Sequence, residues 1–189
     1  MTNPSKEQER LVVRLLPFVL TIAVIVVDQI TKAVIVATVP RVENGTIIPV
    51  IGDFLRIIHT RNLGVAFSLG GAFPEATRRL LFTLLPAVVL LALVIYYVRS
   101  NDFTRLQRWA VAGIIGGGVG NLVDRIFRAD GVVDFVDVKF YGIFGMERWP
   151  TFNVADATVV VCGILLIVSL LFQRPESLPA SEVEHEQES

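Results

Sequence analysis

Four long apolar runs constrain this chain more than any other feature of its sequence. They cover residues 15–35, 80–98, 109–123 and 157–172. A membrane span needs about 20 predominantly apolar residues, with a range of about 17–25. The run 80–98 is uncharged and long enough by itself, and the others reach this length if polar residues occupy their ends. Because lipid offers the backbone no hydrogen-bond partners, and four runs cannot close a barrel, the spans must be helices. The sequence therefore predicts a mainly α-helical membrane protein with four transmembrane helices.

Composition excludes several functional classes. The chain is 53% hydrophobic and 19% charged, and its formal net charge is −1. No basic stripe interleaved with aromatic residues is present, which argues against a nucleic-acid partner. One cysteine and two histidines exclude a disulfide framework and are too few for most zinc centres. We therefore expect no metal and no cofactor.

The apolar runs also divide the chain into parts. We expect a membrane domain at 11–173, and the first run to be a retained signal anchor, since it lacks a small-residue cleavage site. The ends are an N-terminal tail, 1–10, and a disordered acidic tail, 174–189, rich in Pro, Ser and Glu. The expected spans are about 15–37, 78–98, 107–127 and 155–173, with two long loops at about 38–77 and 128–154.

Charge patterning indicates an orientation. Basic residues precede the first run, fill the short link between the second and third, and follow the fourth: Lys6, Arg10, Arg14, Arg99, Arg105, Arg108 and Arg174. The positive-inside rule then puts both termini in the cytoplasm. The long loops also carry basic residues, but each charge counts for less in a longer loop. Both long loops share the opposite face, so any chemistry is expected there.

Both long loops contain strand-like segments. Residues 54–59 are rich in Ile, Leu and Phe, with glycine and asparagine on either side, and residues 131–145 show a similar pattern. These features are typical of strands. We expect a small sheet, built from both loops, against the membrane face.

Several carboxylates lie at helix ends and have structural interpretations. Asp28 and Lys32 are spaced for a helical ion pair. Asp124 has Arg125 beside it as a simple partner. Asp156 precedes a long apolar run, so capping of that helix and a functional role are equally good interpretations.

Asp134 and Asp156 are the strongest candidates for chemistry. They are 22 residues apart and map to the same membrane face. Two carboxylates within about 3 Å of each other hold a single proton between them. The ionised one can take a proton from water while the neutral one donates to a scissile carbonyl. Asp137 is three residues from Asp134, so in a strand it faces the other side and should not act with it.

Three asparagines strengthen this interpretation. Asn62, Asn121 and Asn153 all map to the loop face. Their amides could orient the aspartates or bind the backbone of an extended substrate, although each alone is more often a turn or cap residue.

Other constellations are weaker. A Ser–His protease would have to use His59, with Ser68, and no G-x-S-x-G elbow is present. Cys162 lies within an apolar run without a neighbouring histidine and is expected to pack. The glycine-rich stretch 116–120 lacks the lysine of a phosphate loop, so close helix packing is the better interpretation.

Five ordered motifs resemble the bacterial lipoprotein signal peptidases, also called signal peptidase II. They are "DQITK" (28–32), "RNLGVAFSLG" (61–70), "GGGVGNLVDRIFR" (116–128), "GVVDFVDV" (131–138) and "FNVADA" (152–157). The resemblance covers roughly residues 11–173. It implies four transmembrane helices, a small extracytoplasmic β-cradle and a short periplasmic helix over the site.

This resemblance also implies an activity and its residues. Members of the family are aspartic endopeptidases of the inner membrane, and they cleave prolipoproteins just before a diacylglyceryl-modified cysteine. The catalytic pair falls on Asp134 and Asp156. Supporting positions fall on Asp28, Lys32, Asn62, Gly64, Asn121, Asp124, Arg125 and Asn153, of which Asn62, Asn121, Arg125 and Asn153 would line the substrate cleft. Membrane lipids are expected partners, the active site is expected on the extracytoplasmic face, and we expect a monomer.

Two alternatives from other classes remain open at this level. A small proton-coupled transporter would use helix-end carboxylates, but it predicts acids at mid-span and broken helices. A non-enzymatic membrane scaffold would require neither aspartate.

Overall fold

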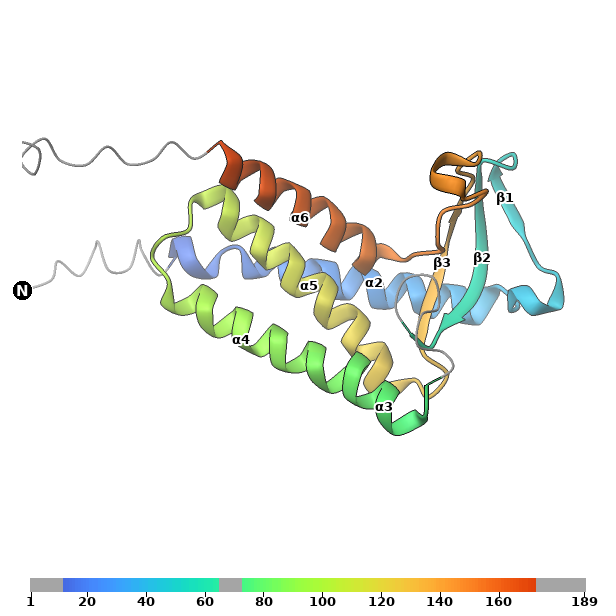
Figure 1. Cartoon of the computed structure of the whole chain (residues 1–189), viewed down its shortest axis with the longest axis horizontal. Helices are drawn as coiled ribbons and strands as arrows, with labels where there is room; N and C mark the ends of the chain where they lie inside the picture. Colours follow the sequence, from blue (N-terminus) through green and yellow to red (C-terminus); the bar gives the residue numbers. More distant parts are fainter. Residues whose placement is uncertain (1–11, 65–72, 173–189) are drawn as a thin grey trace, which may run out of the picture.

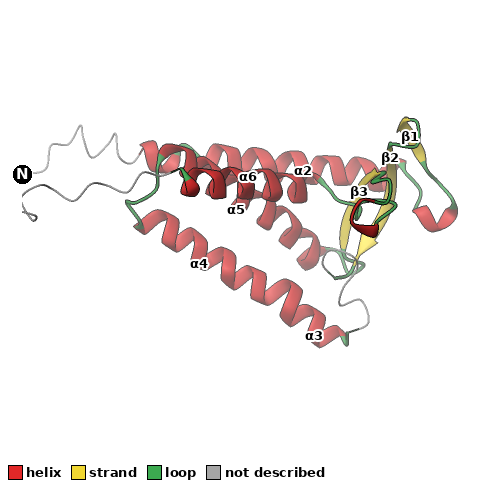
Figure 2. Cartoon of the chain, turned by 45° about the horizontal axis from the view of Figure 1, so that its top comes forward, coloured by secondary structure: helices red, strands yellow, loops and turns green. Residues whose placement is uncertain are grey.

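Four helices dominate the computed structural model, which describes residues 12–64 and 73–172. The helices are α2 (Phe18–Thr38), α4 (Leu85–Arg99), α5 (Arg105–Phe127) and α6 (Val154–Leu171), and α4 continues a short helix α3 (Glu75–Arg79) through a π-helical turn, η3 (Leu80–Leu84). All four are long and apolar enough to cross a membrane. They lie side by side as one bundle (Figures 1 and 2). The predicted fold class is confirmed.

The outer faces of the helices carry large apolar side chains. Leu84, Val88 and Leu91, for example, are 55–61% exposed along one side of η3 and α4. Contiguous apolar surface of this kind is rare on soluble monomers and is what lipid requires of a spanning helix. The bundle therefore presents a lipid-facing exterior along its length.

Helix α5 is the centre of the bundle and packs against α2, α4 and α6. Its glycines permit this closeness. A Cβ at Gly117 would lie 2.5 Å from the carbonyl oxygen of Ala155 at the start of α6, and one at Gly116 would lie 3.0 Å from the carbonyl oxygen of Thr21 in α2. The stretch 116–120 thus serves helix packing, as predicted, and brings the start of α6 against α5.

A three-stranded antiparallel sheet sits at one end of the bundle (Figure 1). Its strands, in the order β1-β2-β3, are β1 (Ile48–Ile51), β2 (Leu55–Asn62) and β3 (Val132–Val138). The strands expected in the two loops are confirmed, and β1 is an additional strand. The described chain ends both lie at the opposite end of the bundle (Figure 1).

A small apolar core attaches the sheet to the bundle. Ile35 and Val39, at the end of α2, pack with Val133 and Phe135 of β3. Alternation along β3 then turns Val133 and Phe135 one way and Asp134 the other. The core therefore fixes the direction in which Asp134 points.

Asp137 belongs to a separate ion-pair cluster in the sheet. Its carboxylate is 3% exposed and lies 2.6 Å from both the Arg56 and the Arg148 guanidinium groups. Arg56 is its cross-strand partner in β2, whereas Asp134 pairs with Thr60. The prediction that Asp137 does not act with Asp134 is consistent with this arrangement.

Candidate active site

The start of α6 organises the site. Asn153 is the N-cap of this helix, and its side-chain oxygen accepts a hydrogen bond from the Asp156 amide at 2.9 Å. Asp156 reciprocates, because its Oδ2 accepts from the Asn153 amide at 3.2 Å. This capping box uses only one oxygen of Asp156. Capping and function are therefore compatible at this residue.

The cap also fixes which way the Asn153 amide points. Because its oxygen is committed to the helix, its nitrogen faces Asp134 and donates to Oδ1 at 2.7 Å. Asn153 is fully buried and Asp134 is 2% exposed. Asn153 thus contacts both candidate carboxylates: its side-chain nitrogen donates to Asp134, and its backbone amide donates to Asp156.

Asn62 holds the second oxygen of Asp134. Its Oδ1 accepts from the Gly64 amide at 3.0 Å, which leaves its nitrogen to donate to Asp134 Oδ2 at 3.1 Å. Gly64 therefore orients Asn62 through its backbone. Both oxygens of Asp134 accept hydrogen bonds from neutral amides.

Asn121 of α5 does the same for Asp156. Its oxygen accepts from the Lys32 ammonium at 2.9 Å and from Asn153 at 3.1 Å, so its nitrogen faces Asp156 Oδ1, at 2.7 Å. The ammonium group can only donate, which settles the direction of this amide. Lys32 therefore acts on Asp156 through Asn121.

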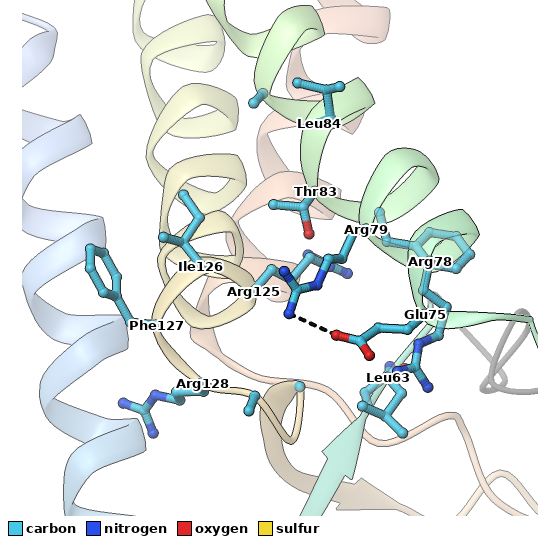
Figure 3. A pocket seen from close by; sticks show the side chains of 15 residues that line it. Leu63, Glu75, Arg78, Arg79, Thr83, Leu84, Arg125, Ile126, Phe127 and Arg128 are labelled. Carbon is cyan, nitrogen blue, oxygen red and sulfur yellow. Dashed lines mark ion pairs between the residues drawn. The ribbon is translucent and has the colours of Figure 1, made fainter.

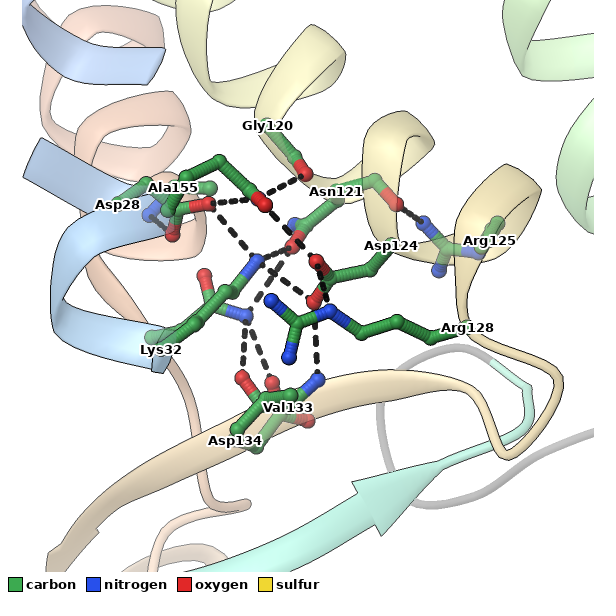
Figure 4. A network of polar contacts seen from close by, with 12 residues as sticks. Asp28, Lys32, Gly120, Asn121, Asp124, Arg125, Arg128, Val133, Asp134 and Ala155 are labelled. Carbon is green, nitrogen blue, oxygen red and sulfur yellow. Dashed lines mark hydrogen bonds and ion pairs between the residues drawn. The ribbon is translucent and has the colours of Figure 1, made fainter. Parts of the chain in front are cut away.

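Lys32 forms a buried charge cluster with two further carboxylates. Its ammonium lies 2.8 Å from Asp28 and 3.1 Å from Asp124, and all three side chains are fully buried (Figure 4). With Asn121, these partners occupy the three donors of the ammonium group. The predicted Asp28–Lys32 ion pair is confirmed.

The same two carboxylates attach the elements that carry the candidate pair. Asp28 Oδ1 accepts from the Ala155 amide at 3.0 Å, at the start of α6, and Asp124 Oδ2 accepts from the Val133 amide at 3.0 Å, next to Asp134. Figure 4 shows both connections. The cluster therefore sets the position of α6 and β3 relative to each other.

The prediction that Asp124 pairs with Arg125 is wrong. Asp124 pairs with Lys32 and with Arg128, whose Nε lies 3.2 Å away, because adjacent residues of a helix point in different directions whereas residues four apart share a face. Gln29 also belongs to this network and was not predicted from the sequence. Its amide donates to Asp28 and to Asp124, at 3.1 Å each, and bridges the two acids.

Arg125 connects the helix to the loop after β2. Its guanidinium donates to the carbonyl oxygen of Gly64 at 3.1 Å and lies near enough to Asp156 and Asp134 to interact with their charges. It makes a long contact of 3.5 Å with the carbonyl of its own helix at Asn121. Arg125 thus offers a guanidinium group to a carbonyl or carboxylate that enters the site.

The electrostatics of Asp134 favour a retained proton. Burial, followed by the negative charge of Asp156, raises the pKa of Asp134 to about 7, although the amides of Asn62 and Asn153 oppose this shift. A carboxyl group of this kind can exchange a proton near neutral pH. The surroundings of the two carboxylates therefore suit an acid and a base acting together.

The competing residues have other surroundings. His59 is buried, with Nδ1 2.8 Å from the carbonyl oxygen of Val39, and Ser68 lies outside the described residues. Cys162 is buried against Gly113, as expected for a packing residue. Within residues 12–64 and 73–172, no group of three or more His, Cys, Asp or Glu side chains is arranged to hold a metal.

Comparisons with known proteins point to one family. Residues 20–172 match the family model described as signal peptidase (SPase) II. The lipoprotein signal peptidase of Treponema denticola is 54% identical over 158 residues, which are 84% of this chain and 90% of that protein. That of Treponema pallidum is 49% identical over 153 residues, or 81% of each chain.

A solved structure agrees. A chain described as a bacterial membrane enzyme, determined by the in meso method, aligns with a TM-score of 0.69 and 28% identity, over 86% of this chain and 94% of that one. The family model covers nearly all of the helices and the whole sheet. This chain therefore belongs to the signal peptidase II family.

Proposed function

We propose that Asp134 and Asp156 are the catalytic pair of a lipoprotein signal peptidase. The observation that supports this most strongly is the shared asparagine. Asn153 donates to Asp134 and caps the helix at Asp156, so the two carboxylates are held in a fixed relation by neutral groups. An arrangement that fixes two acids without neutralising either is what general acid–base chemistry needs.

The reaction is hydrolysis of the peptide bond before a diacylglyceryl-modified cysteine. The ionised carboxylate takes a proton from water, and the resulting oxygen nucleophile attacks the scissile carbonyl carbon. The protonated carboxyl donates to the carbonyl oxygen as the tetrahedral intermediate forms. Collapse of the intermediate breaks the carbon–nitrogen bond: the carboxyl that took the proton from water gives it to the leaving amine, and the other carboxylate takes a proton back from the intermediate's hydroxyl as the C=O bond re-forms. Both acids then regain their starting states.

The surrounding residues have supporting roles in this proposal. Asn62, Asn121 and Asn153 orient the carboxylates, and Arg125 offers its guanidinium to a backbone carbonyl of the extended substrate. Lys32, Asp28 and Asp124 hold β3 and α6 in register, and Gly64 orients Asn62. The hydrogen bonds and ion pairs of these residues support this assignment of roles.

Topology and partners complete the proposal. The substrates are prolipoprotein signal peptides that carry diacylglyceryl-cysteine, and the pair lies at the sheet end of the bundle, where such a group would leave the lipid. We place this end on the extracytoplasmic face of the inner membrane, with both termini in the cytoplasm, and propose that a monomer suffices. The peptidase domain would cover 11–173, and both tails lie mostly outside the described residues. The transporter alternative finds no support in the relatives, which are named as peptidases.

Two isosteric variants test the catalytic pair. Asp134→Asn and Asp156→Asn should each lower the cleavage rate of a diacylglyceryl-modified substrate by on the order of 10²–10⁴-fold, because one removes the acid and the other the base. Gel-shift assays of the purified protein in detergent measure this. Full activity of either variant would exclude the pair.

Asp137→Asn is the matched control. It changes another buried carboxylate of the same strand, one that pairs with Arg56 and Arg148. It should lower thermal stability, because two arginines lose their partner, yet retain cleavage by the folded protein. Equal loss of cleavage in all three variants would indicate that the aspartates serve the fold alone.

A further inference from the structure

A cavity of about 670 Å³ lies at the sheet end of the bundle, beside the candidate active site. Its walls come from the end of β2, the stretch from α3 to the start of α4, and the end of α5 (Figure 3). Asn62 and Arg125 belong both to this wall and to the site. The cavity therefore adjoins the surroundings of Asp134.

The charge of the cavity wall is strongly positive. Four arginines line it, Arg78, Arg79, Arg125 and Arg128, against a single carboxylate, Glu75. Glu75 pairs with Arg79 at 2.7 Å, and Arg128 pairs with Asp124, which is not part of the wall. Within the part of the chain that the structure describes, the Arg78 side chain forms no ion pair. Among the residues of the wall itself, arginines therefore outnumber carboxylates by three.

Most of the remaining wall residues are apolar. Phe82, Leu84 and Ile126 line the cavity on the side that continues into the lipid-facing surface of the helices, and Phe127 beside them is 79% exposed. Cationic residues next to apolar ones match an amphiphile that has an anionic head and hydrocarbon chains. A soluble acidic peptide would satisfy the arginines but not this apolar side.

A local irregularity of the helix shapes the cavity. Residues Leu80–Leu84 form a π-helical turn between α3 and α4. Pro86 explains it, because proline has no amide hydrogen to donate to the carbonyl of Phe82, four residues earlier. Single π turns recur at functional sites. Here the turn contributes Phe82 and Thr83 to the cavity wall.

We propose that this cavity binds an anionic glycerophospholipid, with its phosphate at Arg78 and Arg79 and an acyl chain along Phe82 and Ile126. One guanidinium group can donate two parallel hydrogen bonds to the oxygens of a phosphate. Basic pockets between membrane helices are a known mode of headgroup recognition. The lipid sits beside the catalytic pair without taking part in the chemistry. This inference goes beyond the proposed function and does not depend on it.

The test measures lipid binding directly. The full chain in mild detergent is titrated with phosphatidylglycerol or with phosphatidylcholine of the same acyl chains, and native mass spectrometry reports the bound fraction. The unaltered protein should prefer phosphatidylglycerol. Arg78→Gln combined with Arg79→Gln should weaken its binding roughly fivefold for each charge removed, with phosphatidylcholine unchanged. Glu75→Gln should strengthen it, because the opposing charge is lost.

The control pair is Arg99→Gln with Arg105→Gln, two exposed arginines at the other end of the bundle. It should leave the preference unchanged. The proposal is overturned if both double variants weaken binding equally, if Glu75→Gln does not strengthen binding, or if no preference exists. It is also overturned if the Arg78 and Arg79 changes impair only cleavage of substrates with acidic residues after the cysteine. Repeating the titration with Asp134→Asn separates this result from catalysis.

Discussion

Two groups of aspartates lie within one hydrogen-bond network and have opposite surroundings. Asp28 and Asp124 share the Lys32 ammonium and sit fully buried in the bundle. Asp134 and Asp156 are held by the amides of Asn62, Asn121 and Asn153, and none of the ion pairs among the described residues reaches them. Asn121 joins the groups, since it accepts from Lys32 and donates to Asp156.

This difference separates the carboxylates that stabilise the fold from the two that we propose to be catalytic. Asp28 and Asp124 are committed to an ion pair with Lys32 and to backbone amides. A carboxylate among neutral donors keeps its position without losing its ability to hold a proton. Asp28 and Asp124 fix the positions of α6 and β3, and these two elements carry Asp156 and Asp134.

The largest expected effect comes from removing the cation. Lys32→Met leaves Asp28 and Asp124 buried with less compensation, which should lower the free energy of unfolding by about 3–5 kcal/mol. Thermal unfolding in detergent measures this. Lys139→Met, which removes a lysine from the exposed carboxylates of Asp53 and Glu147, should have a far smaller effect because solvent screens these pairs.

Asp134→Asn, unlike Lys32→Met, should not lower the free energy of unfolding. The folded protein binds the Asp134 proton more tightly than the unfolded chain does, because its pKa is raised. That contribution to stability is complete below the ordinary pKa and is lost as pH rises through about 7. The asparagine variant should therefore be no less stable than the unaltered protein at pH 8. A loss as large as that of Lys32→Met would remove the distinction between the two groups.

A smaller effect tests the asparagine that joins the candidate acids. Serine caps helices as well as asparagine does but cannot reach Asp134, so Asn153→Ser should retain stability while kcat/KM falls roughly 10- to 100-fold. Asn153→Ala should lower both the stability and kcat/KM. Unchanged kinetics in Asn153→Ser would mean that its hydrogen bond to Asp134 has no part in catalysis.

Much of this fold is predictable from the sequence. The four apolar runs define the helices, and the strand-like composition of both loops predicts β2 and β3. Strand β1 escaped prediction because its residues are all exposed and its short run contains a proline. The spacing in "DQITK" predicts the Asp28–Lys32 pair, since residues four apart on a helix always meet.

The site itself was only partly predictable. Spacing indicates which face Asp134 and Asp156 share, but not that Asn153 would join them, because that depends on how α6 begins. The partner of Asp124 was mistaken, as Lys32 comes from another helix and no local pattern encodes that contact. Gln29 and the cavity arginines Arg78 and Arg79 give no signal in sequence, since ordinary surface residues look the same.

The pH dependence of kcat/KM tests the central claim most directly, which is that Asp134 and Asp156 share one working proton. With a diacylglyceryl-modified substrate, kcat/KM should fall above pH about 7, close to tenfold for each further pH unit, because the pair then loses the proton that it donates to the carbonyl. Asp137→Asn should show the same profile. A rate that stays level from pH 6 to pH 9 would contradict the account.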